Sequence, residues 1–240
     1  MSERAPDSSV AAPAPPAASP TVRVPVWDLP VRLFHWTLVA LVAGLVVTGL
    51  LGGDWLAWHM RMGEALIVLV AFRLCWGFAG SENARFAAFL RGPRAVLRYA
   101  RSLVVPPHEV HATHNPLGGW MVIALLAALA LQAGTGLFTN DDILWDGPMV
   151  KRVAKETSDA ISSFHRRFWW VVVALVALHV LAVGAYRAIL KDDLVAPMIR
   201  GWKDLPPRIA SPADAQGSGR RAAVLVTVIA LTVYYALHRL

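Results

Sequence analysis

Charged residues and cysteine are both scarce in this sequence. Only 16% of its 240 residues are Asp, Glu, Lys or Arg, against about 25% in an ordinary soluble domain. There is one cysteine, which excludes a disulfide framework, a Cys-ligated zinc site and an iron–sulfur cluster held by this chain alone. It also excludes covalent haem attachment through C-x-x-C-H. With 56% hydrophobic residues, the composition indicates a membrane protein.

Five apolar stretches are each long enough to cross about 30 Å of hydrocarbon, which takes roughly 20 helical residues. They lie at 32–52, 59–79, 117–138, 165–188 and 222–238. The prediction is an all-α integral membrane protein, in which four transmembrane helices form a bundle and a fifth follows at the C-terminus.

The composition also divides the chain into regions. The first twenty residues are rich in Ala, Pro and Ser without an apolar period, and no apolar h-region of a signal peptide follows the charged start. We therefore expect a disordered cytoplasmic tail at 1–25, a membrane domain at 26–203, a linker at 204–221 and a membrane helix at 222–240. The linker contains the Gly- and Ser-rich string SPADAQGSGRR.

Charges in the loops and the positions of the tryptophans predict the orientation. The segments after the second and fourth spans are rich in Lys and Arg, whereas the 139–164 segment carries five carboxylates against three basic residues. By the positive-inside rule the N-terminus is cytoplasmic and the C-terminus lies outside. The net charge of +7 thus reports orientation, and we expect membrane lipid and no nucleic acid as a partner. Most tryptophans fit two interfacial belts, with Trp27, Trp36, Trp76, Trp120 and Trp202 inside and Trp55, Trp58 and Trp145 outside.

Four of the eight histidines fall inside or at the end of a span, where ionisable residues are costly. His165 and His179 are 14 residues apart on the fourth span, which is about 21 Å and nearly four whole turns. They share one face, His165 near the outer side and His179 near the inner side. His35 lies level with His179, and His59 lies level with His165. The spacing predicts two histidine pairs stacked across the bilayer.

Facing imidazoles in an apolar bundle are typical of haem ligation. Zinc usually takes four protein ligands, or three and a water, whereas a haem iron needs only two axial ligands from the protein. Bis-His ligation leaves no open coordination position and favours electron transfer over oxygen binding. The pattern predicts two noncovalent haem b groups.

Three arginines and one glycine are candidates for lining the two expected haem sites. Arg73 follows His59 by 14 residues, so it lies at the depth of the inner pair, where a haem propionate would neutralise it. Arg32 and Arg61 lie close to the inner and outer levels, and either bind propionates or snorkel to the interface. Gly49 either admits a macrocycle or serves close helix packing.

Several strings resemble the bacterial cytochrome b561 family and the related b-type cytochrome subunits of nickel–iron hydrogenases. They are VWDLPVRLFHW at 26–36, WHMRMGEALIVLVAFRLCWGFAG at 58–80, ARFAAFLRGPRAVLRY at 84–99, HNPLGGWM at 114–121 and the SFHRRF…ALH arrangement at 163–179. The resemblance covers about 26–203 and places the axial ligands at His35, His59, His165 and His179.

This resemblance implies a bacterial inner-membrane protein with a four-helix core and two b haems. Such a protein passes electrons between a quinone pool and a periplasmic redox partner, such as a c-type cytochrome or a hydrogenase-like subunit. The chain departs from the family at Arg166, where an acidic residue is common, and the fifth span lies outside the common core.

The role of His114 stays open at this point, because it lies at the cytoplasmic start of the third span. It can bond a propionate, line a quinone pocket or replace His35 as a ligand. The surrounding HEVHATH string at 108–114 is not H-E-x-x-H and predicts an exposed turn. The 148–164 stretch predicts either an amphipathic surface helix over the outer haem or a solvated connector.

Two other functions are compatible with a membrane protein of this composition. A histidine-lined metal or proton transporter needs a continuous polar path, which the nearly all-apolar first and fourth spans do not offer. A haem-free membrane anchor has no need of four histidines matched in depth.

Overall fold

The computed structural model describes residues 21–103, 111–207 and 218–239. Five of its helices are long and apolar enough to cross a membrane, which confirms the predicted fold class. They are α1 (Leu29–Leu51), α2 (Trp55–Ala79), α5 (Pro116–Gly136), α6 (Lys155–Ala188) and α8 (Gly219–His238).

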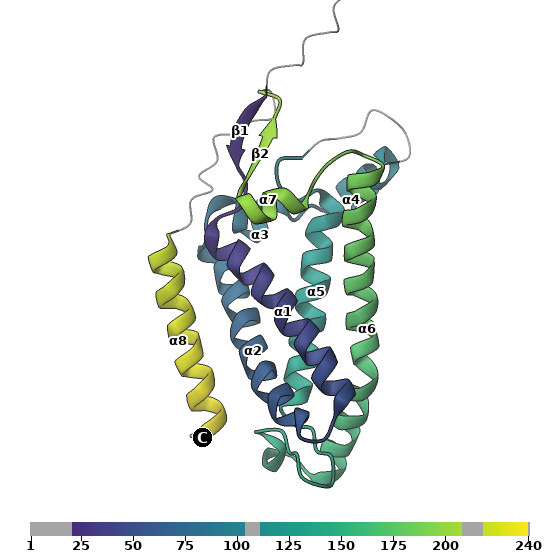
Figure 1. Ribbon diagram of the computed structural model, residues 1–240, viewed down its shortest axis with the longest axis vertical. Helices are drawn as coiled ribbons and strands as arrows, with labels where there is room; N and C mark the ends of the chain where they lie inside the picture. The colour runs from purple at the N-terminus through teal and green to yellow at the C-terminus, as the bar shows by residue number, and fades with distance from the viewer. Residues whose placement is uncertain (1–20, 104–110, 208–217, 240) are drawn as a thin grey trace, which may run out of the picture.

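The shorter elements gather mostly at one end of the bundle, which we call the hairpin end (Figure 1). There β1 (Val22–Pro25) pairs antiparallel with β2 (Trp202–Leu205). Helices α3 (Phe86–Phe89), α4 (Pro93–Ser102) and α7 (Val195–Arg200) lie at the same end, and a 3-10 turn, η1 (Glu82–Ala84), precedes α3. The two strands were not anticipated: β1 lies at the end of the expected tail, and β2 crosses the boundary between the expected membrane domain and the linker.

The opposite end, which we call the loop end, holds the connections at 52–54 and 137–154. The second connection contains one 3-10 turn, η2 (Val150–Arg152). Helix α6 begins at Lys155, ten residues before the span expected from hydropathy. The 148–164 stretch is therefore neither a separate surface helix nor a plain connector, because most of it is the first part of α6.

The bundle packs as two helix pairs. Helix α1 lies along α2, α5 lies along α6, and α2 with α5 joins the two pairs. Helix α6 makes at most marginal close backbone contact with α1 or α2, although its Val172 belongs to one buried cluster with Leu66 and Val70 of α2. Helix α8 packs against α2 and touches α1, with its C-terminal end toward the loop end (Figure 1).

Asp28 ties the start of α1 to the end of α2. Its Oδ1 accepts a hydrogen bond from the backbone N–H of Val31 at 2.8 Å, which caps the helix, and its Oδ2 accepts one from the Trp76 indole at 3.0 Å. Trp76 is only 2% exposed. It is therefore a core residue and not part of the interfacial belt to which the sequence assigned it.

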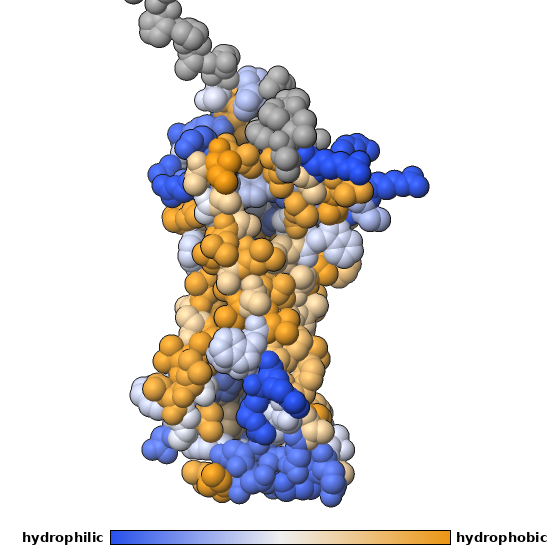
Figure 2. Space-filling model, turned by 90° about the vertical axis from the view of Figure 1, so that its right-hand side faces the viewer, coloured by the Kyte–Doolittle hydropathy of each residue, from blue (hydrophilic) through white to orange (hydrophobic). Residues whose placement is uncertain are grey.

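Apolar side chains dominate the outer surface between the two ends. Figure 2 shows hydrophobic residues over the middle of one face, with hydrophilic residues concentrated toward both ends. Large side chains such as Leu50, Phe78, Leu181 and Leu231 are more than 60% exposed. This distribution suits a protein whose middle is surrounded by lipid.

Candidate functional site

The structure brings His59 and His165 together at the loop end of the bundle. Their ring centroids are 6.3 Å apart and the rings are nearly perpendicular, at 86°. His59 lies in the second turn of α2, and His165 lies on α6. This juxtaposition agrees with the depth predicted from the sequence.

The ring of His59 is fixed by α1. Its Nδ1 lies 3.0 Å from the carbonyl oxygen of Leu45, to which it donates a hydrogen bond, and 3.4 Å from the hydroxyl of Thr48. This bond places the proton on Nδ1 and leaves the lone pair on Nε2, as in histidines that bind metals. A Cβ at Gly49 would lie 3.1 Å from the His59 ring, so the glycine provides room for it.

The ring of His165 is fixed by α5 in a similar way. Its Nδ1 lies 3.1 Å from the hydroxyl oxygen of Thr135, whose own proton is directed to a backbone carbonyl of α5. The Nδ1–H of His165 is therefore the donor. Its Nε2 lies 3.3 Å from the Gln132 amide nitrogen, and a Cβ at Gly136 would lie 3.1 Å from the ring.

His35 on α1 and His179 on α6, the second pair expected from the sequence, both lie toward the hairpin end. Both are half-buried and close enough to interact electrostatically. The His35 Nδ1 is buried and has no hydrogen-bond partner among the residues that the structure describes. The His35 ring meets Trp36 edge-on, with 5.0 Å between centroids.

Arg73 on α2 is a buried cation beside this second pair. It is only 3% exposed, and its Nη1 has no hydrogen-bond partner within the described ranges. Its guanidinium lies 4.9 Å from the centroid of the Phe86 ring, and Asp28 is a nearby negative charge. An unpaired buried guanidinium is costly, so this position favours an anionic ligand.

His114 lies in the same region, between two aromatic rings. Its centroid is 4.7 Å from that of Trp27 and 4.5 Å from that of Phe89. Burial, followed by the nearby Arg73 guanidinium, lowers the pKa of His114 to about 3, so the ring is neutral at pH 7. The exposed turn expected at 108–114 is wrong for His111 and His114, which are half-buried, and His108 lies outside the described residues.

The other two candidate arginines are engaged elsewhere. The Nη1 of Arg32 donates a hydrogen bond to the backbone carbonyl of Ile199 on α7, at 2.6 Å, although its buried Nε has no partner in the described chain. Arg61 is exposed and lies 5.6 Å from the ring centroid of Trp58. These contacts favour a role at the hairpin end for Arg32 and a role at the loop end for Arg61.

An apolar layer separates the two histidine pairs. Leu66, Val70, Leu129 and Val172 are buried at its centre. Phe168 and Val176 of α6 pack against them, one turn after His165 and one turn before His179. We call this layer the septum, and it keeps polar groups out of the space between the pairs.

Four polar residues of the site were missed in the sequence: Thr48 beside His59, Gln132 and Thr135 beside His165, and Asp28 at the start of α1. Gln132 and Thr135 contact His165, and they are the only polar side chains other than Trp in the interior of the third apolar span. Polar residues within a span mark functional positions, so this signal could have found them. The contact of Asp28 with Trp76 gave no such signal, because it joins residues 48 positions apart in sequence.

These residues fit haem better than a bare metal ion. The described ranges hold no group of three or more His, Cys, Asp or Glu that could bind a metal ion. A metal at either histidine pair therefore needs ligands from elsewhere, and a porphyrin supplies four. The glycines beside His59 and His165 leave room for the two imidazoles, and the unpaired Arg73 cation beside the other pair suits an anionic macrocycle.

Comparison with known proteins places these features in a family. The family model described as prokaryotic cytochrome b561 matches residues 26–201. Relatives called "Probable Ni/Fe-hydrogenase B-type cytochrome subunit" include one from Azotobacter chroococcum, 23% identical over 74% of this chain and 87% of the relative, and one from Bradyrhizobium diazoefficiens, 24% identical over 76% and 85%. A similarly named "Ni/Fe-hydrogenase 1" subunit from Escherichia coli K12 is 22% identical over 74% and 89%.

No solved structure matches the chain at a significant level. The family match covers the four bundle helices and all four paired histidines, while α8 lies beyond it. The chain belongs to the prokaryotic cytochrome b561 family, whose members are membrane electron-transfer proteins that hold haem b.

Proposed function

We propose that this protein holds two noncovalent haem b groups, one between His35 and His179 and one between His59 and His165. The observation that carries the proposal is the arrangement of α6, which places one histidine opposite α1 and another opposite α2 at two depths. At the loop end both Nδ1 atoms are already engaged. The Nε2 atoms are therefore the ones proposed to coordinate iron, and at His165 this requires that the iron replace the contact of Nε2 with the Gln132 amide.

Two further residues are proposed to bind the hairpin-end haem. The Arg73 guanidinium is suited to pair with a propionate, and neutral His114 can donate a hydrogen bond to one. Arg32 and Arg61 are less directly placed, because Arg32 bonds to Ile199 and Arg61 lies beside Trp58. When bound, each haem supplies an iron that takes up and releases one electron.

The chain's own residues prepare this chemistry. The septum is apolar, and the hydrogen bonds that His59 and His165 donate to Leu45 and Thr135 fix the loop-end imidazoles. Two axial histidines leave no open position for oxygen, which favours electron transfer over oxygen chemistry.

We further propose that electrons pass between a quinone pool and a periplasmic redox partner. The names of the relatives support a hydrogenase subunit as that partner, and a c-type cytochrome is the other partner of matching chemistry. The charge distribution of the loops supports a cytoplasmic N-terminus in the bacterial inner membrane.

A reduced-minus-oxidised spectrum with a pyridine haemochrome assay tests the proposal on the purified protein. We expect about two b haems per chain. His59→Ala and His165→Ala should each remove the loop-end haem, whereas His35→Ala and His179→Ala should each remove the other. His238→Ala, on α8, is the matched control and should keep both.

The absence of haem in the unmodified protein would overturn the proposal in favour of a haem-free membrane anchor. A single haem lost equally in all four variants would overturn the two-site arrangement. If His165→Ala removed only the haem bound by His35, the pairing would be wrong.

A further inference from the structure

Helix α4 has three distinct faces. Its Tyr99 is buried, and the Tyr99 hydroxyl lies 2.7 Å from that of Tyr186, which fastens α4 to α6. Arg94, Arg98 and Arg101 follow one another at spacings of four and three residues, so they share a second face. We call these three residues the arginine stripe, and the third face of the helix is apolar.

Within the described part of the chain, the arginine stripe has no countercharge. All three arginines are exposed, and no ion pair joins them to a described carboxylate. In the sequence, residues 83–108 include five arginines and no Asp or Glu. Like charges three or four residues apart on a helix repel one another, so this face favours an anion.

An open apolar groove of about 290 Å³ adjoins the stripe. It is lined by four residues of α4 and one of α5, namely Pro93, Val96, Leu97, Ala100 and Trp120. Leu97 is 55% exposed. It follows Arg94 by three residues and precedes Arg101 by four, so it lies at the border between the groove and the stripe.

The groove lies at the boundary of the membrane. Trp120 is in the second turn of α5, which is one of the membrane-crossing helices, and its side chain is partly exposed. Its indole N–H donates a hydrogen bond to the backbone carbonyl of Arg91 at 2.9 Å. Tryptophans at the ends of spans lie at the level of the lipid headgroups, and a helix with one basic and one apolar face lies in the same layer. The groove is therefore placed where headgroups give way to acyl chains.

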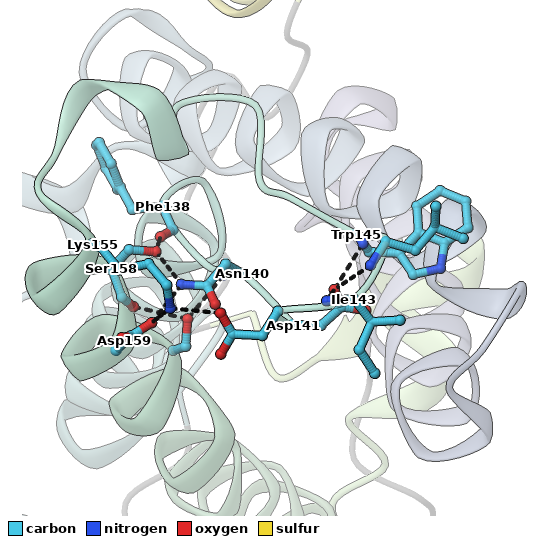
Figure 3. Close-up of polar contacts among 11 residues, drawn as sticks. Phe138, Asn140, Asp141, Ile143, Trp145, Lys155, Ser158 and Asp159 are labelled. Atoms are coloured by element: carbon cyan, nitrogen blue, oxygen red, sulfur yellow. Dashed lines mark hydrogen bonds and ion pairs between the residues drawn. The ribbon is translucent and has the colours of Figure 1, made fainter.

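The charged groups at the loop end are arranged differently. Lys155 forms ion pairs with Asp142 and Asp159, and the Asn140 side chain donates hydrogen bonds to Ser158 and Asp159 (Figure 3). These basic and acidic groups satisfy one another, whereas the arginine stripe at the hairpin end is open to an external anion.

We propose that α4 and Trp120 form a binding site for an anionic membrane phospholipid. Its phosphate lies on the arginine stripe, where guanidinium groups bind phosphate oxygens through charge-assisted hydrogen bonds, and one of its acyl chains lies in the groove. An acidic protein would also neutralise the arginines, but it would leave the apolar groove at the level of the acyl chains unfilled. The site needs neither haem nor electron transfer, so it goes beyond the proposed function.

Native mass spectrometry of the full chain in detergent, titrated with phosphatidylglycerol, tests the proposal. We expect one retained phosphatidylglycerol and much weaker retention of zwitterionic phosphatidylcholine. The variant Arg94→Gln/Arg98→Gln should bind phosphatidylglycerol about twenty-five-fold more weakly, because each basic residue near an anionic lipid contributes about a factor of five in affinity. The matched control is Lys151→Gln/Arg152→Gln, which removes two exposed charges at the loop end and should bind as the unmodified protein does.

A second variant tests the groove without changing any charge. Ala100→Phe fills the groove from its wall and should weaken binding of phosphatidylglycerol several-fold. Its control is Ala223→Phe, at an exposed position of α8, which should leave binding unchanged. Circular dichroism checks that each variant keeps its helix content, and either variant alone decides the outcome if the other does not fold.

Four results would overturn the proposal. Unchanged binding in a folded variant of the stripe or of the groove would show that the lipid lies elsewhere. Equal retention of phosphatidylglycerol and phosphatidylcholine would contradict selection by charge. Displacement of the lipid by excess inorganic phosphate would identify a site for free phosphate. No retained lipid at all would leave the stripe to an acidic protein.

Discussion

Gly136, the last residue of α5, leaves space for the ring of His165. A Cβ at this position would lie 3.1 Å from the imidazole, whereas a Cβ at Gly134 would meet nothing within 4 Å. We therefore expect Gly136→Val to displace the ring and to remove the loop-end haem. The haemochrome assay should show about half of the haem content, with the hairpin-end spectrum retained.

Gly134→Val is the control for this change, because both variants place a β-branched residue near the end of the same helix. It should retain the full haem content. Equal loss in the two variants would show that helix propensity, and not contact with His165, decides the outcome.

At this scale the sequence predicted which histidines lie together but not what fixes them. The 14-residue spacing of His165 and His179 is a property of one helix and can be read directly from the sequence. The contact of Thr135 with His165 joins residues of two helices, and it depends on how α5 is rotated against α6. The rotation of one helix against another follows from side-chain packing, which cannot be read from the hydrophobic periodicity of the sequence.

At the scale of elements, Asp28 joins two helices through one carboxylate. Asp28→Ala removes the cap of α1 and leaves the Trp76 indole N–H buried without its acceptor. We expect a loss of about 2 kcal/mol in the free energy of unfolding, from roughly 1 kcal/mol for the cap and a similar amount for the hydrogen bond. Denaturant unfolding in detergent measures it.

The control is a double-mutant cycle with Trp76→Phe, which keeps the ring and removes only the N–H donor. In the Asp28→Ala background this second change should cost less than it does alone, since its partner is already absent. Strictly additive effects would contradict a direct contribution of the bond between the two side chains.

Helix α8 is an addition to the bundle and not a part of the histidine sites. It packs on α2, where Ala222 joins the core at the hairpin end and His238 lies 3.2 Å from Glu64. We expect a chain that ends at residue 217 to keep both haems and to unfold at a lower temperature. Haem content and thermal unfolding in detergent measure the two effects.

Full-length His238→Ala serves as the comparison for this truncation, because it removes the contact with Glu64 and keeps the helix. It should lower the unfolding temperature less than the truncation does. Loss of a haem on truncation would mean that α8 supports one of the histidine pairs.

The elements themselves were largely predictable, because runs of about 20 apolar residues decide where spans lie. The early start of α6 was not, since Lys155–Phe164 is polar and gives no hydropathy signal. The pairing of β1 with β2 was also hidden. Each strand has four residues, too few for a periodicity, and the two lie at opposite ends of the membrane domain.

At the scale of the whole molecule, five spans place the N- and C-terminal segments at opposite ends (Figure 1). Together with the basic loops, this predicts that the C-terminus is outside the cell membrane. Alkaline phosphatase fused to residue 240 should therefore be active in cells, because the enzyme needs an oxidising compartment.

The same enzyme fused after residue 217, before α8, should be inactive, which makes it the internal control. Activity of this shorter fusion together with inactivity of the longer one would reverse the predicted orientation.

The distance between the two histidine levels on either side of the septum has an electrical consequence. The two histidine levels are about 21 Å apart along α6, which is roughly two-thirds of the hydrocarbon thickness. A charge that moves between them crosses a similar share of the membrane voltage, worth about 1.6 kcal/mol for every 100 mV. Electron transfer between the two proposed haem sites would therefore be electrogenic, and an energised membrane would favour one direction of transfer over the other.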